Sequence, residues 1–240
     1  MPAEGMRTAS LNATLPAEGF LLPRTVIIAN GPFGLNDLAA ARRLIAPTDR
    51  LIAADGGAAH CRALGLTPHV LIGDFDSVPP DELAALENAG AQVIRHPVRK
   101  DQTDLELALD LALRDGADDI LILAALGGRW DQTLANVFLL ARPGLDSARV
   151  RLADGKQQIT LLRGPGQIAL DGQPGDTVSL IPIGGDARGM TTTGLEYPLK
   201  DGMLKFGSTR GVSNALVEAQ ATVALQEGLL VCVLISSTED

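Results

Sequence analysis

The sequence predicts an α/β domain followed by an all-β domain, and two patterns carry this expectation. From residue 24 to residue 141, short apolar runs alternate with helical segments, which is typical of a parallel sheet with crossover helices. After residue 149, short strand-like runs are separated by glycine-rich turns, which favours an antiparallel sandwich. We therefore expect a mainly parallel, Rossmann-like sheet first and a β-sandwich second.

The predicted boundary between the two domains lies near residues 143–147, where Pro143 and Gly144 interrupt the alternating pattern. We accordingly expect a loose tail over residues 1–23, the α/β domain over 24–145 and the β-sandwich over 146–240. The first 22 residues hold no continuous apolar run, so they resemble neither a secretory signal nor a membrane span.

The α/β domain is expected to contain five strands, each followed by a helix. The strands are predicted over residues 25–29, 51–54, 70–73, 92–95 and 120–125. The helices are predicted to end near residue 45, to cover 58–64, 80–90 and 104–114, and to finish with 131–141. Pro80 suits the first turn of its helix, and Thr103 with Glu106 fits a capping box.

The all-β domain is expected to contain short strands with turns between them. The strands are predicted over residues 149–152, 158–162, 167–170, 177–183, 221–225 and 229–235. The turns fall at Asp154-Gly155, Gly164-Pro165-Gly166, Asp171-Gly172, Gly184-Gly185 and Asp201-Gly202.

The composition is that of an ordinary globular protein, and it excludes some classes of partner. Hydrophobic residues make up 46% of the 240 residues, but aromatic residues only 3%, so aliphatic side chains must build the core. A net charge of −9 argues against a nucleic-acid-binding or anionic membrane-binding surface. Cys61 and Cys232 are far apart in apolar surroundings, which indicates buried thiols and a reducing compartment. We expect a cytoplasmic protein.

Asp74 and Asp76 directly follow the apolar strand that ends at Gly73. Side chains two residues apart in an extended segment point the same way, so both carboxylates can face one point beyond the strand. Ligands bind at this edge of open α/β sheets, and neighbouring carboxylates favour a hard divalent cation such as Mg²⁺. A solvated turn without a ligand is the alternative interpretation of an Asp-x-Asp sequence.

Two other strand ends carry glycine. Asn30-Gly31 follows the first expected strand, and Asp55-Gly56-Gly57 follows the second. Glycine lets backbone N–H groups approach a phosphate closely, although ordinary tight turns explain each segment singly.

A third group of polar residues lies before the helix predicted over residues 104–114. Asp101 and Asp104 suit the dipole of that helix, and Thr103 suits its cap, so a well-capped helix alone explains the segment. Both acids nevertheless belong to the same sheet edge as Asp74, where Lys100 could offset part of their charge or reach a phosphate.

The segment Gly127-Gly128-Arg129-Trp130-Asp131-Gln132 follows the last strand of the α/β domain. Two glycines and an arginine before a helix suit phosphate binding, with Arg129 as a bidentate clamp and Asp131 as a helix cap or site residue. One predicted edge therefore gathers six acids, which together suit a metal-dependent enzyme acting on a polyphosphate: Asp55, Asp74, Asp76, Asp101, Asp104 and Asp131.

In their order along the chain, these motifs resemble those of the thiamine pyrophosphokinase family. The resemblance continues in the C-terminal half with Gly194-Leu195-Glu196-Tyr197-Pro198-Leu199 and Gly211-Val212-Ser213-Asn214, and it runs from about residue 24 to residue 235. It implies a kinase that moves the pyrophosphoryl group of ATP onto the hydroxyl of thiamine, giving thiamine diphosphate and AMP. It also implies a homodimer with thiamine bound near the subunit interface.

The resemblance implies roles for individual residues. It makes Asp74, Asp76 and Asp104 the Mg²⁺ ligands, and Asp101 and Asp131 further members of the catalytic site. Thiamine would contact Tyr197, Ser213 and Asn214. The residues implied to bind ATP are Asn30, Gly31, Asp55, Gly56, Gly57, Lys100, Thr103, Gly128, Arg129 and Gln132.

One aromatic residue departs from the family pattern. Some family members stack thiamine on a late tryptophan, whereas Trp130, in the first domain, is the single tryptophan here. Tyr197 or Phe206 could take its place.

Two alternative functions also stay open: a phosphohydrolase of the haloacid-dehalogenase type, with Asp74 as nucleophile, and a non-catalytic thiamine or nucleotide sensor.

Overall fold

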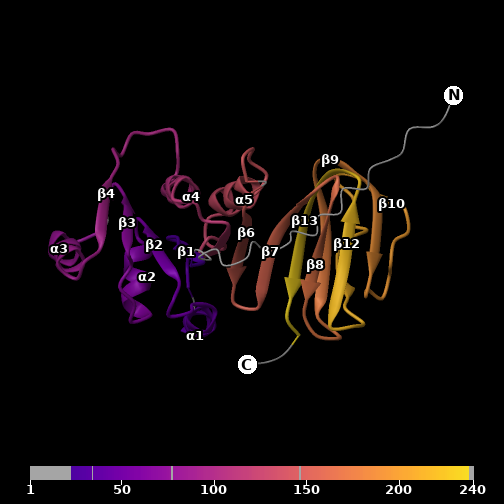
Figure 1. The fold of residues 1–240 in the computed structure, drawn as a ribbon, viewed down its shortest axis with the longest axis horizontal. Coiled ribbons are helices and arrows are strands. Elements are labelled where there is room, and N and C mark those ends of the chain that lie inside the picture. Colours follow the sequence, from indigo (N-terminus) through magenta and orange to yellow (C-terminus); the bar gives the residue numbers. More distant parts are fainter. Residues whose placement is uncertain (1–22, 34, 77, 146, 238–240) are drawn as a thin grey trace, which may run out of the picture.

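A computed structural model describes residues 23–237 apart from residues 34, 77 and 146 (Figure 1). The predicted loose tail therefore lies almost wholly outside the described residues. No helix among the residues described is long and apolar enough to cross a membrane.

The N-terminal half contains a parallel sheet whose strand order places a crevice at its centre. Strands β1 (Thr25–Ile28), β2 (Arg50–Ala54), β3 (Val70–Gly73) and β4 (Gln92–Arg95) progress in one direction from β1. Strand β5 (Asp119–Leu123) lies on the other side of β1 and is parallel to it. Because the chain reverses direction across the sheet between β1 and β5, their carboxyl ends flank a topological switch point, where ligands bind in such sheets.

Helices cover both faces of this sheet (Figure 1). Helices α1 (Leu35–Leu44), α2 (Gly57–Ala63) and α3 (Pro80–Asn88) contribute Ala41, Cys61 and Leu83 to one core cluster. Helices α4 (Asp104–Arg114) and α5 (Trp130–Leu139) lie on the opposite face. Their side of the core contains Leu105, Ala108 and Leu109 of α4. Near-continuous apolar strands buried on both faces explain why strands 25–29, 51–54 and 70–73 were predictable.

Strand β6 (Arg149–Asp154) joins the two halves through backbone hydrogen bonds. It pairs in parallel with β5 and antiparallel with β7 (Gln157–Arg163), so one hydrogen-bonded sheet continues from the first half into the second. The prediction that this strand starts a purely antiparallel sheet is wrong, because its apolar pattern did not identify its partner. The domain boundary near residues 143–147 stays a prediction.

The C-terminal half is antiparallel, which confirms the expected change from a parallel to an antiparallel sheet. Strand β13 (Glu227–Ile235) lies between β7 and the long strand β9 (Thr177–Thr193). The far end of β9 pairs with β12 (Gln220–Leu225), which in turn pairs with β8 (Gly166–Asp171). Two short strands, β10 (Gly202–Leu204) and β11 (Asn214–Ala215), also pair with β9.

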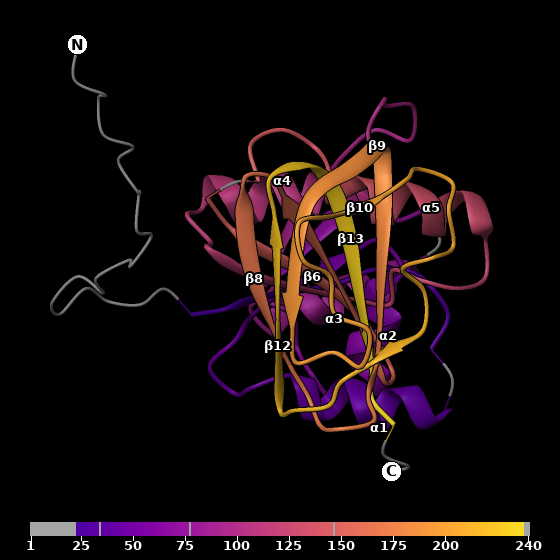
Figure 2. The same cartoon turned by 90° about the vertical axis from the view of Figure 1, so that its right-hand side faces the viewer.

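Strand β9 corrects one predicted turn. Gly184-Gly185 does not end the strand, which continues to Thr193, and Gly184 has a φ of +70°. The pairing register shifts between Glu227 and Leu229 of the neighbouring β13. The two glycines therefore lie at a bulge or irregularity within the sheet rather than in a turn. One core cluster joins Val178 and Leu180 of β9 to Val223 of β12, and Figure 2 shows these strands side by side.

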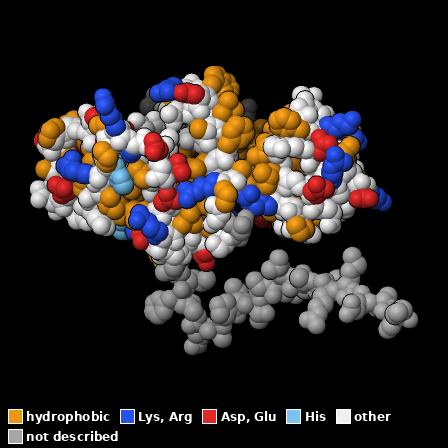
Figure 3. Space-filling model, turned by 90° about the horizontal axis from the view of Figure 1, so that it is seen from above, with side chains coloured by type: hydrophobic (Ala, Val, Ile, Leu, Met, Phe, Trp, Pro, Cys, Tyr) orange, Lys and Arg blue, Asp and Glu red, His pale blue; other side chains and the backbone are white. Residues whose placement is uncertain are grey.

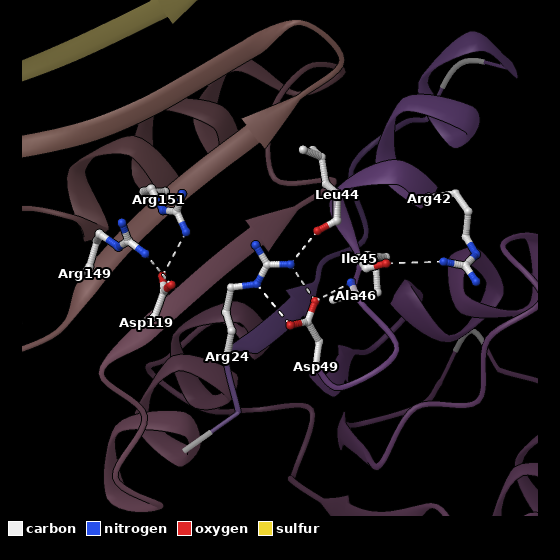
Figure 4. Close-up of polar contacts among 9 residues, drawn as sticks. All are labelled: Arg24, Arg42, Leu44, Ile45, Ala46, Asp49, Asp119, Arg149 and Arg151. Atoms are coloured by element: carbon white, nitrogen blue, oxygen red, sulfur yellow. Dashed lines mark hydrogen bonds and ion pairs between the residues drawn. The ribbon is translucent and has the colours of Figure 1, made fainter. Parts of the chain in front are cut away.

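Two arginine–carboxylate groups hold the strand edge opposite the switch point (Figure 4). Arg24 donates to both oxygens of Asp49 from Nε and Nη2, at 3.1 and 2.6 Å, while the backbone N–H of Ala46 also donates to Asp49. Asp119 at the start of β5 accepts from Arg149 and Arg151 of β6. The second group therefore links side chains across the strand pair that joins the two halves.

Candidate active site

A cavity of about 700 Å³ opens at the switch point between β1 and β5. Its lining comes from segments that follow successive strands of the sheet, together with the first turn of α4. This convergence follows from the parallel strand order, because all carboxyl ends lie at the same edge. The lining includes these sequence-predicted site residues: Asn30, Gly31, Asp55, Asp74, Lys100, Thr103, Asp104, Gly128, Arg129 and Gln132.

The structure brings Asp55, Asp74 and Asp76 together at this edge. One carboxylate oxygen from each of these residues lies within 4.8 Å of the corresponding oxygen of the other two. Between the two acids of the Asp-x-Asp sequence, Phe75 adopts a φ of +57°, which is costly for a bulky residue. Phe75 is buried in the core and the guanidinium of Arg95 lies over its ring, so packing holds this backbone conformation.

The carboxyl group of Asp55 lies in an environment that disfavours its charged form. Burial is the largest cause of a raised pKa at Asp55, and the nearby charges of Asp104, Asp74 and Asp76 raise it further. The Oδ1 atom is buried without a hydrogen-bond partner, whereas Oδ2 accepts a long bond of 3.4 Å from Asn30 Nδ2. A cation at this point would satisfy the unpartnered oxygen.

Lys100 lies between two of the acids. Its Nζ atom is 2.9 Å from Asp104 Oδ1 and 3.4 Å from Asp74 Oδ2. Asp104 is the first residue of α4, and Thr103 caps that helix by accepting a hydrogen bond from the N–H of Glu106 at 3.2 Å. The predicted cap is confirmed, and it fixes the start of α4, from which Asp104 lines the cavity.

Two predicted site acids lie apart from this cluster. Asp101 is exposed in the loop before α4 and does not line the cavity. Asp131 is 64% exposed and accepts two hydrogen bonds from Arg129, which hold its pKa below the usual range. Helix α5 begins at Trp130 without a side-chain cap bond, so the predicted cap role of Asp131 is wrong.

The glycines at the cavity are explained partly by backbone packing. A Cβ on Gly31 would lie 2.4 Å from the carbonyl oxygen of Ala124, which accepts a hydrogen bond from the N–H of Gly31 where the chain leaves β1. A Cβ on Gly57 would lie 2.0 Å from the carbonyl oxygen of Ile28, where α2 begins against β1. A side chain at Gly31 would therefore push apart the segments that follow β1 and β5, and one at Gly57 would push the start of α2 away from β1.

His60 is a cavity residue that the sequence analysis did not select. Its Nε2 lies 2.8 Å from the carbonyl oxygen of Gly31, and since a carbonyl can only accept, Nε2 donates. Its ring also meets the ring of Phe33 edge to face. A single histidine inside a short apolar helix gives no sequence signal of such a contact. This hydrogen bond from His60 holds the turn after β1 in place.

A second cavity, of about 330 Å³, lies in the C-terminal half and contains all three predicted thiamine residues. Asn214 accepts a hydrogen bond from the N–H of Tyr197 and donates one to its carbonyl, at 3.1 and 2.9 Å. The N–H of Ser213 donates to Ser179 Oγ at 3.1 Å, and Ser213 has a φ of +62°. Arg210 and Val212 also line this cavity, whereas Phe206 does not.

A mainly parallel sheet with helices on both faces makes the N-terminal half an α/β domain, and its carboxylates and lysine gather at the switch point, where ligands bind in such sheets. Two family models then match it. Residues 41–152 match the catalytic domain of thiamin pyrophosphokinase, and residues 167–230 match its vitamin B1 binding domain. The chain belongs to the thiamine pyrophosphokinase family.

Individual relatives agree with this assignment. Thiamine pyrophosphokinase of Bacillus subtilis is 34% identical over 189 residues, which cover 78% of this chain and 87% of that enzyme. A crystal structure of the enzyme from B. subtilis superposes with a TM-score of 0.78, covering 90% of this chain and all of the other. Thiamine pyrophosphokinase 1 of Arabidopsis thaliana is 31% identical, with 71% of this chain and 67% of that protein aligned.

Proposed function

We propose that the cavity at the switch point is where this chain carries out the activity of its family. In that reaction the hydroxyl oxygen of thiamine bonds to the β-phosphorus of ATP while the bond from this phosphorus to the AMP oxygen breaks. Thiamine diphosphate and AMP are formed, and the hydroxyl proton is released. The observation that carries this site assignment is the convergence of Asp55, Asp74 and Asp76 within 4.8 Å.

The residues of this cluster fit a Mg²⁺ ion. All three side chains offer hard oxygen donors, and the buried Oδ1 of Asp55 has no other partner. We assign the ion to Asp74, Asp76 and Asp104, as the family resemblance implies, with Asp55 as a further ligand because it converges with Asp74 and Asp76. When bound there, Mg²⁺ would offset the negative charge that develops on the phosphate oxygens.

The chain's own residues position the nucleotide. Lys100 and Arg129 line the same cavity as the acids, so both cations can pair with phosphate oxygens. Gly127 and Gly128 have φ values of +82° and +65°, and this turn presents backbone to the cavity without side-chain bulk. Asp101 and Asp131 would act from the rim, through charge, and we propose no direct ligand role for them.

Thiamine is assigned to the second cavity, beside Tyr197, Ser213 and Asn214. The two cavities share no lining residue, because residues 29–136 line one and residues 180–214 the other. The transfer requires ATP and thiamine to meet, which supports a homodimer in which one subunit's thiamine cavity faces its partner's nucleotide cavity. On this view a Rossmann-like half and a β-sandwich half carry one substrate each, in a cytoplasmic enzyme.

The decisive measurement is AMP formation by the purified protein with ATP, thiamine and Mg²⁺. We expect AMP and thiamine diphosphate in equal amounts, and a loss of at least about a hundredfold in Asp74→Asn, because the variant lacks a carboxylate proposed to hold the cation that would stabilise charge in the transition state. Asp118→Asn is the matched control, since Asp118 is exposed before β5 at the opposite edge of the sheet.

Other outcomes would identify the alternatives. Orthophosphate release without thiamine would support the phosphohydrolase hypothesis, and thiamine binding without AMP would support the sensor hypothesis. Equal activity of Asp74→Asn and the wild type would move the active site elsewhere.

A further inference from the structure

Lys100 supplies the acidic cavity with a cation of its own. The ammonium contacts Asp104 at 2.9 Å and Asp74 at 3.4 Å, and the Lys100 side chain is only 13% exposed. Surrounding water therefore screens these contacts less than it screens an ion pair on the surface. Asp74 also belongs to the group of carboxylates that converge within 4.8 Å, so one acid serves both Lys100 and the cluster.

We propose that Lys100 is an internal counter-ion that keeps the metal affinity of this cluster low until a nucleotide binds. This inference rests on the function proposed above. An ammonium on Asp74 repels a divalent cation on the same carboxylate, and the repulsion is strong in a partly buried site. The free enzyme therefore binds the metal weakly, although its acids are already in place.

A nucleotide reverses the effect of the same lysine. Its phosphates bring several negative charges into the cavity that Lys100 lines, so the ammonium gains a new partner and leaves Asp74 to the metal ion. Metal and nucleotide then favour each other's binding. Thermodynamic reciprocity requires the nucleotide to raise metal affinity by the same factor as the metal raises nucleotide affinity.

The test is a titration of the nucleotide-free protein with Mn²⁺, in which paramagnetic resonance measures the free ion. We expect Lys100→Met to bind Mn²⁺ about tenfold more tightly than the wild type, a factor within the usual range for coupled sites. Lys100→Arg keeps the charge and should retain the wild-type affinity. Lys156→Met is the matched control, because Lys156 lies exposed at the turn between β6 and β7.

A second titration adds the ATP analogue with a methylene between the α- and β-phosphorus. We expect this analogue to raise Mn²⁺ affinity by a smaller factor in Lys100→Met than in the wild type. Asp74→Asn should lose most of the tight Mn²⁺ binding in every protein background, which locates the ion at the cluster. Lys100→Gln provides a second neutral variant if Lys100→Met does not fold.

Unchanged Mn²⁺ binding in the neutral variants would overturn the inference, because Lys100 would then not oppose the metal ion. Weaker binding would also overturn it, because Lys100 would then hold the carboxylates in place rather than compete for them. Failure of the proposed function is separate, since it would appear as a wild-type protein that forms no thiamine-dependent AMP. If the wild type forms AMP and the neutral variants bind Mn²⁺ no more tightly, the inference alone fails.

Discussion

At the scale of single residues, the positions that hold the site differ in how visible they are in sequence. Asp74 and Asp76 were predictable because a strand of apolar residues ends immediately before them. His60 was not, because its bond to Gly31 depends on how α2 lies against the turn after β1. Asp131 was predicted as a site residue for the same reason as Asp74, because it comes after the end of a strand. Its side chain instead pairs with Arg129 at the surface.

Asp176 gives a residue-scale prediction outside the site. It is 3% exposed, and it accepts hydrogen bonds from the N–H groups of Gln173 and Ser237 and from Ser237 Oγ, at 2.8 to 2.9 Å. Burial raises its pKa, but these bonds outweigh burial and leave the pKa below its ordinary value. We expect Asp176→Asn to lower the free energy of unfolding by about 2 kcal/mol near neutral pH.

The pH dependence follows from the direction of that shift. Because the folded-state pKa of Asp176 is depressed, its contribution is present above the unfolded value of about 3.9 and is lost as pH falls through the folded value. Urea unfolding of the wild type and of Asp176→Asn at about pH 7 and about pH 3 checks this. The difference between their free energies of unfolding should be smaller at the lower pH. An equal gap at both pH values would show that the carboxylate charge is not responsible.

At the scale of elements, α4 matters because its N-cap residue Thr103 and its first residue Asp104 both line the cavity. We expect Thr103→Ala to lower the free energy of unfolding by about 1 kcal/mol through loss of the cap. Thr103→Ser keeps the hydroxyl and should remain close to the wild type. Chemical denaturation of the three proteins measures this, and a Thr103→Ala protein as stable as Thr103→Ser would contradict a cap contribution.

Most elements of the α/β half were predictable because their local signals agree with their environment. Apolar runs mark strands buried on both faces, and Pro80 and Thr103 mark helix starts that the structure contains. Pairing partners were less predictable, because an apolar run is the same for a parallel and an antiparallel neighbour. Strand β6 is the clearest example, since it pairs in parallel with β5 and antiparallel with β7. A turn signal also misled, because Gly184 lies inside β9.

At the scale of the whole molecule, the separation of the two cavities predicts complementation between inactive variants. On the assignment proposed above, Asp74→Asn would disable the cavity at the switch point, and Asn214→Ala would disable the second cavity by removing the hydrogen bonds to Tyr197. In a symmetric dimer with shared sites, a mixed dimer of the two variants retains one site with both cavities intact.

We therefore expect an equimolar mixture, after subunit exchange, to recover about a quarter of wild-type AMP formation, because half the dimers are mixed and each has one working site. Each variant alone should be nearly inactive. The assay is AMP formation before and after mixing, with size-exclusion chromatography to follow the dimer. No recovery in a mixture shown to exchange subunits would place both substrates within one chain.

Acidic and basic side chains are interspersed with hydrophobic ones on the face seen in Figure 3, so the net charge of −9 is not concentrated there. The charges nearest the site are those of local groups such as Lys100 and Asp74, whose Nζ and Oδ2 atoms lie 3.4 Å apart. A local origin also means that added salt should affect exposed pairs more than the partly buried contacts of Lys100.

The pairing of β6 with β5 has a consequence for the solubility of the protein. Two separate sheets would each present an unpaired strand to solvent where the halves now meet, and unpaired strands are templates for association with other chains. Joining the sheets through β5, β6 and β7 covers both of these edges within one molecule. The outermost strand of the α/β half is then β4, whose four residues and arginine offer a neighbouring chain little to pair with.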